Sequence, residues 1–284
     1  MDITQRKPSN LISPMSSLLK AVSILKCFSY DEPELGISDI VQKVEMPRTT
    51  VHRILSTLIR AELLSRKNHT GKYRIGPALY TMGSLYLVTT DILSAAEPVT
   101  ELLNELSGEA IKLAVFDRGN IIVIKKEESR YSFRYHHAVG SILPAYASAM
   151  GKALLSELSE IELESLYPSE FLKPLTSKTI STKAELIQVL EKIRISGVSV
   201  DIEENTEGLS GVACVIRDAT DKAIAAMCIG VPAHTFNEER KRQLATLNKM
   251  GASLISYRLG YQDEGNTVRS LEDIRAWWES CQSA

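Results

Sequence analysis

One short segment gathers hydroxyl, imidazole and guanidinium side chains on one side of a helix-forming sequence. Between residues 48 and 60, apolar residues recur at helical spacing, and at about 100° per residue the opposite face is polar. Side chains of these types form hydrogen bonds with base edges and phosphates. The pattern predicts DNA contacts from Arg48, Thr49, Thr50, His52, Arg53 and Ser56.

A helix-turn-helix followed by a β-wing would present that face to DNA. Upstream, apolar residues between 37 and 44 recur at i, i+3, i+4 and i+7, with Ser38 as the expected N-cap and a break before Pro47. Downstream, two short β-prone segments enclose the basic stretch 66–72, which predicts a hairpin. This wing would reach phosphates or the minor groove through Arg66, Lys67, Lys72 and Arg74. Residues 16–76 are therefore predicted to form a winged helix-turn-helix domain.

Positive charge is concentrated in this predicted domain. The 284 residues include 33 Lys and Arg and 35 Asp and Glu, a formal net charge of −2, so affinity for nucleic acid must come from local charge. Residues 48–74 contain seven Lys or Arg residues and one acidic residue, Glu62. The sequence has no apolar run of about 18 residues and no apolar signal segment, which predicts a cytoplasmic protein with no membrane partner.

The rest of the chain has the pattern of an α+β domain behind a linker helix. We expect a polar arm over 1–15, a linker helix over 77–96, a domain over 97–262 and a tail over 263–284 that forms an amphipathic helix against the domain. Further elements are expected as a hairpin over 110–124, strands over Tyr131–His136, 212–216 and 223–229, and helices near Ser148, after the capping box Thr182 to Glu185, and over Asn237–Leu259.

Several motifs resemble those of the IclR family of bacterial transcriptional regulators over roughly residues 16–262. They are Met46 to Leu55 in the predicted recognition helix, Gly71 to Gly76 in the wing, Tyr146 to Leu155, and Asp201 to Asn205 with Gly208 and Leu209. The blocks Tyr131 to Lys152 and Asp201 to Asn205 look most like regulators of sugar-acid and carbohydrate breakdown. The resemblance implies a winged helix-turn-helix, a linker helix and a GAF-like α+β effector-binding domain, assembled as a homodimer or homotetramer on double-stranded operator DNA.

The resemblance also implies a pocket for a small carboxylate effector. By motif, its lining would be Ser148, Ala149, Met150, Asp201, Leu209, Gly211, Cys228 and Gly230. Backbone N–H groups at the helix start would hold the carboxylate without a buried lysine or arginine, and Asp201 would accept hydrogen bonds from ligand hydroxyls. Where relatives that bind small keto acids commonly have Cys near 211 and Ser at 228 and 230, this chain has Gly, Cys and Gly, which favours a different ligand and a roomier pocket.

The sequence predicts no catalytic residue, metal or cofactor. The stretch from Gly208 to Val212 lacks G-x-S-x-G spacing, and neither H-E-x-x-H nor a phosphate-binding loop occurs. The adjacent His136 and His137 would point to opposite faces of a strand, so they cannot chelate one metal. Four cysteines without C-x-x-C spacing are expected to be buried or free thiols: Cys27, Cys214, Cys228 and Cys281. The alternative is an enzyme or thiol redox sensor carrying a DNA-binding module, and turnover of candidate sugar acids would separate these functions.

Overall fold

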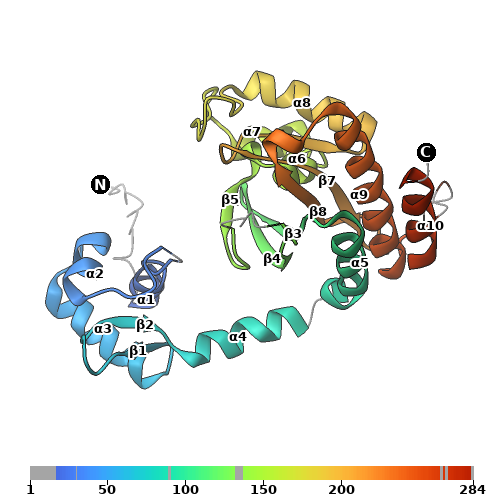
Figure 1. The fold of residues 1–284 in the computed structure, drawn as a ribbon. Coiled ribbons are helices and arrows are strands. Elements are labelled where there is room, and N and C mark those ends of the chain that lie inside the picture. The colour runs from blue at the N-terminus through green and yellow to red at the C-terminus, as the bar shows by residue number, and fades with distance from the viewer. Residues whose placement is uncertain are drawn as a thin grey trace, which may run out of the picture. The chain divides into compact units, whose positions relative to one another are not determined.

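The chain folds into two compact units, residues 1–90 and 91–284 (Figure 1). The computed structural model describes residues 17–29, 31–88, 91–131, 137–262, 265 and 268–282. The arm expected over 1–15 lies outside the described residues, as does the strand expected over Tyr131–His136 apart from Tyr131 itself, which is in a bend.

The first unit is a helical core with a two-stranded wing, followed by a further helix. Its elements are α1 (Ser17–Leu25), α2 (Ile37–Val44), α3 (Arg48–Arg60), β1 (Leu64–Arg66), β2 (Tyr73–Ile75) and α4 (Pro77–Val88). Strands β1 and β2 are antiparallel with Leu64 opposite Ile75, and Leu35 bridges to Tyr73. Buried apolar side chains from α1, α2, α3 and both strands form one core. The predicted winged helix-turn-helix is confirmed.

The turn between α2 and α3 fixes how the two helices meet. Glu45 adopts a left-handed conformation with φ of 50°, and its N–H donates to the Val41 carbonyl at 3.1 Å. The prediction of Ser38 as N-cap is wrong, because α2 already begins at Ile37 and Gly36 is its cap. The Gly36 N–H donates to Asp39 Oδ2 at 2.8 Å, so a carboxylate in the first turn stabilises the helix start.

The second unit is built on a six-stranded antiparallel sheet in the order β5-β4-β3-β8-β7-β6. Its elements are α5 (Asp91–Ser107), β3 (Ala110–Asp117), β4 (Asn120–Glu127), β5 (Ile142–Pro144), the 3₁₀ turn η1 (Ala145–Ala147), α6 (Ala149–Leu155), α7 (Glu160–Leu166), α8 (Lys183–Ser196), β6 (Ser199–Ile202), β7 (Leu209–Arg217), β8 (Ala223–Pro232), η2 (Ala233–Thr235), α9 (Glu238–Arg258) and α10 (Leu271–Gln282). The sequence pattern did not predict β5 and β6, because three and four residues are too few to show a period.

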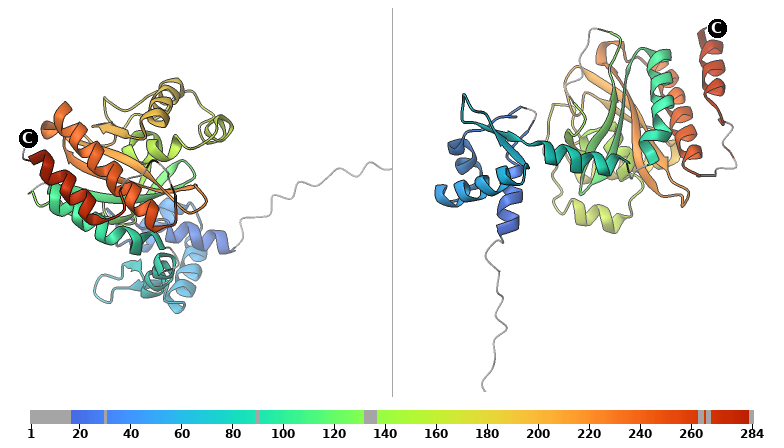
Figure 2. Two further views of the ribbon diagram at one scale, coloured as in Figure 1. Left: turned by 90° about the vertical axis from the view of Figure 1, so that its right-hand side faces the viewer. Right: turned by 90° about the horizontal axis from the view of Figure 1, so that it is seen from below.

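Helices cover both faces of this sheet (Figures 1 and 2), and alternate residues of β3 belong to different cores. Helices α5 and α9 pack on one face, where Ile111 and Leu113 of β3 are buried, and α10 packs against these two helices. Helices α6, α7 and α8 pack on the other, where Ala114 is buried. Strand alternation therefore places Lys112 on the α6 side of the sheet.

The C-terminal helix α10 is part of the second unit, as its amphipathic pattern predicted. Ile274 and Trp278 are buried in the core shared with α5 and α9. The Arg240 guanidinium lies 5.8 Å from the centroid of the Trp278 ring, and its Nη2 is 3.2 Å from Glu109 Oε1. A cation from α9 thus contacts α10 and the buried carboxylate of Glu109 together.

Candidate functional site

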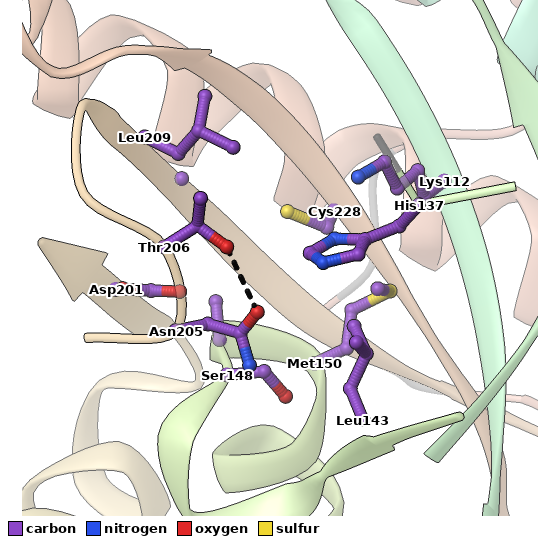
Figure 3. A pocket seen from close by; sticks show the side chains of 12 residues that line it. Lys112, His137, Leu143, Ser148, Met150, Asp201, Asn205, Thr206, Leu209 and Cys228 are labelled. Atoms are coloured by element: carbon purple, nitrogen blue, oxygen red, sulfur yellow. Dashed lines mark hydrogen bonds between the residues drawn. The ribbon is translucent and has the colours of Figure 1, made fainter. Parts of the chain in front are cut away.

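A cavity of about 410 Å³, its open mouth included, lies in the second unit between the sheet and α6 (Figure 3). Strands β3, β5, β6, β7 and β8 contribute to it, together with the start of α6 and the loop between β6 and β7. Its lining is Lys112, His137, Leu143, Ser148, Ala149, Met150, Asp201, Asn205, Thr206, Leu209, Gly211 and Cys228. Mixed apolar and polar lining of this extent is typical of a small-molecule site.

The cavity brings together seven of the eight residues that the family resemblance implied for a pocket. The exception is Gly230, which is not in the lining and pairs with Gly211 and Ala110 within the sheet. Sequence reasoning missed Lys112 and His137, together with Leu143, Asn205 and Thr206. The one signal for Lys112 was a charged residue in an otherwise apolar strand, and His137 gave none.

The start of α6 forms one wall of the cavity and is fixed by two contacts. Ser148 is the N-cap, and its Oγ accepts a hydrogen bond from the Gly151 N–H at 3.1 Å. A Cβ on Gly151 would lie 2.2 Å from the carbonyl oxygen of Ala145, so only glycine lets α6 approach η1 this closely. The N–H groups of Ala149 and Met150 occupy the first helical positions, outside the intrahelical ladder. They are the hydrogen-bond donors of this wall.

Asp201 also lines the cavity, and it lies at the start of the loop between β6 and β7, on the side of Asn205 and Ser148 (Figure 3). Its Oδ1 accepts a hydrogen bond from the Glu204 N–H at 2.7 Å. Burial, reinforced by the negative charge of Glu204, raises the pKa of Asp201 to about 7. Near neutral pH the carboxyl is therefore present in both forms and is able to accept or donate a hydrogen bond. Beside it, Thr206 Oγ1 donates to Asn205 Oδ1 at 3.1 Å.

A buried ion pair ties this loop to α6. Lys152 is 1 % exposed, and its Nζ donates to Glu204 Oε1. Thr179 Oγ1 donates to the Glu204 carbonyl at 2.6 Å, and Thr176 Oγ1 donates to the Glu203 carbonyl at 2.7 Å. The loop that carries Asn205 and Thr206 is thereby anchored on two sides, so the polar wall of the cavity is preformed.

The floor of the cavity contains Cys228, next to Gly211 of the neighbouring strand. A Cβ on Gly211 would lie 3.0 Å from Cys228 Sγ and 2.9 Å from the Ile229 carbonyl oxygen. The extra room expected at Gly211 is therefore taken by the thiol. Burial raises the pKa of Cys228 to about 12, which keeps the thiol protonated at physiological pH. This environment gives the thiol-sensor alternative no support.

The polar face predicted on α3 lies at the surface of the first unit. Val51, Leu55 and Leu58 are buried in its core. On the other side Thr50 is half-buried, while the remaining predicted contacts are exposed, namely Arg48, Thr49, His52, Arg53 and Ser56. Ser56 Oγ donates to the His52 carbonyl at 3.0 Å, which leaves the hydroxyl oxygen as an acceptor. The arrangement resembles a helix poised to enter a major groove.

All four predicted wing cations are exposed, and three of them have contacts within the unit. Arg66 Nε donates to the Gly71 carbonyl at 3.1 Å, and Arg74 Nε donates to Ser65 Oγ at 3.1 Å. Lys67 Nζ lies 2.5 Å from Glu34 Oε1. No local pattern indicated this acidic partner, because Glu34 precedes α2 and the wing follows α3.

Sequence comparisons match both units to one family. Residues 17–67 match the IclR helix-turn-helix domain, and residues 84–257 match the family described as bacterial transcriptional regulator IclR C-terminal. The chain belongs to the IclR family of bacterial transcriptional regulators. The predicted family, α+β fold class and regulator function are confirmed.

Relatives and solved structures agree with this assignment. The transcriptional regulator KdgR of Escherichia coli K12 is 31% identical over 88% of this chain and 94% of its own length. The transcriptional repressor AllR of Salmonella typhi is 32% identical over 86% of this chain and 90% of its own length. The crystal structure of Thermotoga maritima IclR has a TM-score of 0.68 and 29% identity, over 87% of this chain and 100% of that one. An IclR homologue from Microbacterium hydrocarbonoxydans, crystallised with 4-hydroxybenzoate, shares the fold with a TM-score of 0.76. Its identity is 22%, over 86% of this chain and 99% of that one.

In the part of the chain that the structure describes, the His, Cys, Asp and Glu side chains form no group of three or more able to hold a metal ion. None of the described helices combines the length and apolar character required to span a bilayer.

Proposed function

We propose that this IclR-type regulator is a cytoplasmic, non-enzymatic switch that binds operator DNA and is controlled by a small organic acid, such as a sugar acid. The observation that carries the proposal is the preformed cavity, which is lined both by the N–H donors at the start of α6 and by the carboxyl of Asp201. The 4-hydroxybenzoate in a homologue of the same fold supports an acid as the occupant. Incubating the purified protein with acids found to bind, and finding their product, would contradict the non-enzymatic part.

DNA is read by α3 and held by the wing. Arg53 lies on the exposed face of α3, so Arg53→Ala should cost about 1–3 kcal/mol of operator affinity and relax base preference if the guanidinium contacts a guanine. Lys72 lies at the wing, and Lys72→Ala should weaken binding to every sequence alike. Gel-shift titrations on operator and random DNA test both, and equal losses for the two variants would remove the base-reading role from Arg53.

The regulator binds DNA as a homodimer or as a pair of dimers. One recognition helix contacts too few base pairs for genomic specificity, whereas two related by a twofold axis read a palindromic site. Helix α4 offers apolar surface for such pairing, because Tyr80, Met82 and Leu85 are 80%, 58% and 61% exposed. Light scattering should give a dimer or tetramer, and a monomer that protects a single half-site would contradict this proposal.

The effector carboxylate binds at the start of α6, and its hydroxyls face Asp201. Met150→Pro would remove one N–H and should abolish the response, while Asp201→Ala should weaken effector binding by about 1.5–3 kcal/mol and leave operator binding without effector intact. A thermal-shift screen of sugar acids and aromatic acids identifies the ligand. If Asp201→Ala lowered operator affinity without effector and left the effector titration unchanged, Asp201 would be a structural residue.

A further inference from the structure

We propose that Lys112 selects the effector by charge: its ammonium binds the effector carboxylate together with the first turn of α6, so that the cavity takes organic acids in preference to neutral polyols of the same shape. This inference rests on the proposed function, because it concerns the same cavity. It adds a specificity-determining side chain that the family motifs did not contain.

The placement of Lys112 requires an explanation, since lysines are rarely buried. Lys112 is 3% exposed and lies in the middle of β3, directly opposite Cys228 of β8. Its neighbours Ile111 and Leu113 are fully buried on the other face of the sheet. Because successive side chains of a strand point to opposite faces, the Lys112 side chain lies on the α6 side of the sheet, where it lines the cavity. A buried amine in a central strand costs desolvation free energy, which a bound anion would offset.

The polar groups of the cavity are divided between two sides (Figure 3). Lys112 and His137 lie next to each other on one side, and Asp201 and Asn205 lie on the other, with Cys228 between them. An occupant with an acidic group at one end and hydroxyls at the other matches this division. A neutral polyol would form hydrogen bonds on the Asp201 side but would bring no negative charge to Lys112.

Burial explains how Lys112 would respond to an acid. It lowers the pKa of Lys112 to about 7, while the nearby thiol of Cys228 and the carboxylates of Glu128 and Asp201 act in the opposite sense and Lys126 acts in the same sense. The other titratable groups lining the cavity are His137 and Asp201. An anion stabilises the ammonium and raises its pKa, so binding above about pH 7 takes up a proton and the affinity falls as the pH rises.

The test compares two acids with their neutral counterparts on three forms of the full chain. The acids are gluconate and 4-hydroxybenzoate, and the counterparts are glucitol and 4-hydroxybenzamide. The forms are wild type, Lys112→Met and the control Lys126→Met, which removes a lysine from the residue paired with Lys112 on β4 but outside the cavity lining. Thermal shift and titration calorimetry measure affinity, and calorimetry in buffers of different ionisation enthalpy measures proton uptake.

We expect wild type and Lys126→Met to bind at least one of the two acids more tightly than the neutral counterpart of that acid. The affinity of Lys112→Met for the same acid should be roughly ten- to hundred-fold lower than that of wild type. Proton uptake on binding should also fall in Lys112→Met. Because the substitution removes a buried amine that costs desolvation free energy, the variant should keep its circular dichroism spectrum and unfold at the same or a higher temperature than wild type.

Other outcomes overturn the inference in distinguishable ways. If Lys112→Met is folded and retains the acid preference and the proton uptake, Lys112 does not select the effector, although the proposed function stands. If neither acid stabilises wild type at millimolar concentration, the inference falls together with the proposal that the cavity binds such acids. If Lys112→Met and Lys126→Met lost equal affinity for the acid, the effect would come from the net charge near the cavity and not from Lys112 itself.

Discussion

The DNA-facing surface of the first unit and the cavity of the second hold their charges in opposite environments. Arg48, Arg53 and Lys72 are exposed, where water solvates each cation and keeping it costs almost no folding free energy. Lys112, Lys152 and Asp201 are removed from water, so each needs a partner, a shifted pKa or a ligand. A change at the surface should therefore alter binding alone, whereas a change at the cavity should alter stability and binding together.

The largest expected effect is at the buried ion pair behind the cavity. Lys152→Met leaves the Glu204 carboxylate buried without its cation, and Glu204 Oε2 already has no hydrogen-bond partner. Breaking such a pair from one side should lower the free energy of unfolding of the second unit by about 3–5 kcal/mol. Urea denaturation followed by circular dichroism measures the loss.

A double variant sharpens this prediction. Lys152→Met with Glu204→Leu replaces both charges by apolar groups, and it should recover most of the lost stability. Effector affinity should remain low in the double variant, because the loop carrying Asn205 and Thr206 has lost its anchor. If the single substitution cost less than about 1 kcal/mol, the pair would behave as a surface pair and the contrast between the two regions would weaken.

The next effect concerns the close approach of α6 to η1. In Gly151→Ala the new Cβ would overlap the Ala145 backbone, so the start of α6 must move. The free energy of unfolding should fall by about 2–3 kcal/mol, and the effector response should be lost. Gly83→Ala is the matched control: Gly83 lies within α4 and a Cβ there meets nothing within 4 Å. That control should leave stability unchanged or raise it by up to about 1 kcal/mol. A similar gain of stability in both variants would mean that helix propensity, and not the contact with Ala145, determines the result.

The two regions also differ in how far sequence predicted them. The winged helix-turn-helix was predictable because its signals are local: the period of α3, the basic stretch of the wing and the break before Pro47 all lie within one short segment. The N-cap at Thr182 was recognisable for the same reason, since Thr182 Oγ1 accepts from the Glu185 N–H at 3.2 Å.

The chemistry of the cavity was only partly predictable. Family motifs placed Ser148, Asp201 and Cys228, but Lys112 lies outside the motifs, and the block that contains His137 gave it no role in the pocket. Their role depends on strand pairing, which sets Lys112 opposite Cys228 from a distant part of the chain. Lys152 and Glu204 are 52 residues apart, so their pairing has no local signal either. A charged residue that is buried in the fold cannot be distinguished by local sequence from one that is exposed to water.

A smaller, pH-dependent effect is expected at Asp201. Its pKa is raised by burial, so the folded state favours the neutral carboxyl, and wild type should lose stability as the pH rises from about 4 to about 7. Asp201→Asn keeps an acceptor for the Glu204 N–H and carries no charge. It should therefore exceed wild type in stability above pH 7, with the difference shrinking towards pH 4. Denaturation at a series of pH values tests this, and a constant difference would show that burial does not control this carboxyl.

The smallest effect is at the surface, where Glu34 holds Lys67 of the wing at 2.5 Å. Glu34→Gln removes a negative charge beside a predicted DNA contact, so affinity for operator and random DNA should rise together, by roughly two- to five-fold at low salt, and the gain should vanish at high salt. Glu238→Gln breaks a similar exposed pair with Lys241, at 2.6 Å in the second unit, and should leave DNA affinity unchanged. Stability should be unaffected in both variants, since exposed pairs contribute little to folding. A lower DNA affinity in Glu34→Gln would instead mean that the carboxylate positions the wing, and the surface of the first unit would then share the structural dependence of the cavity.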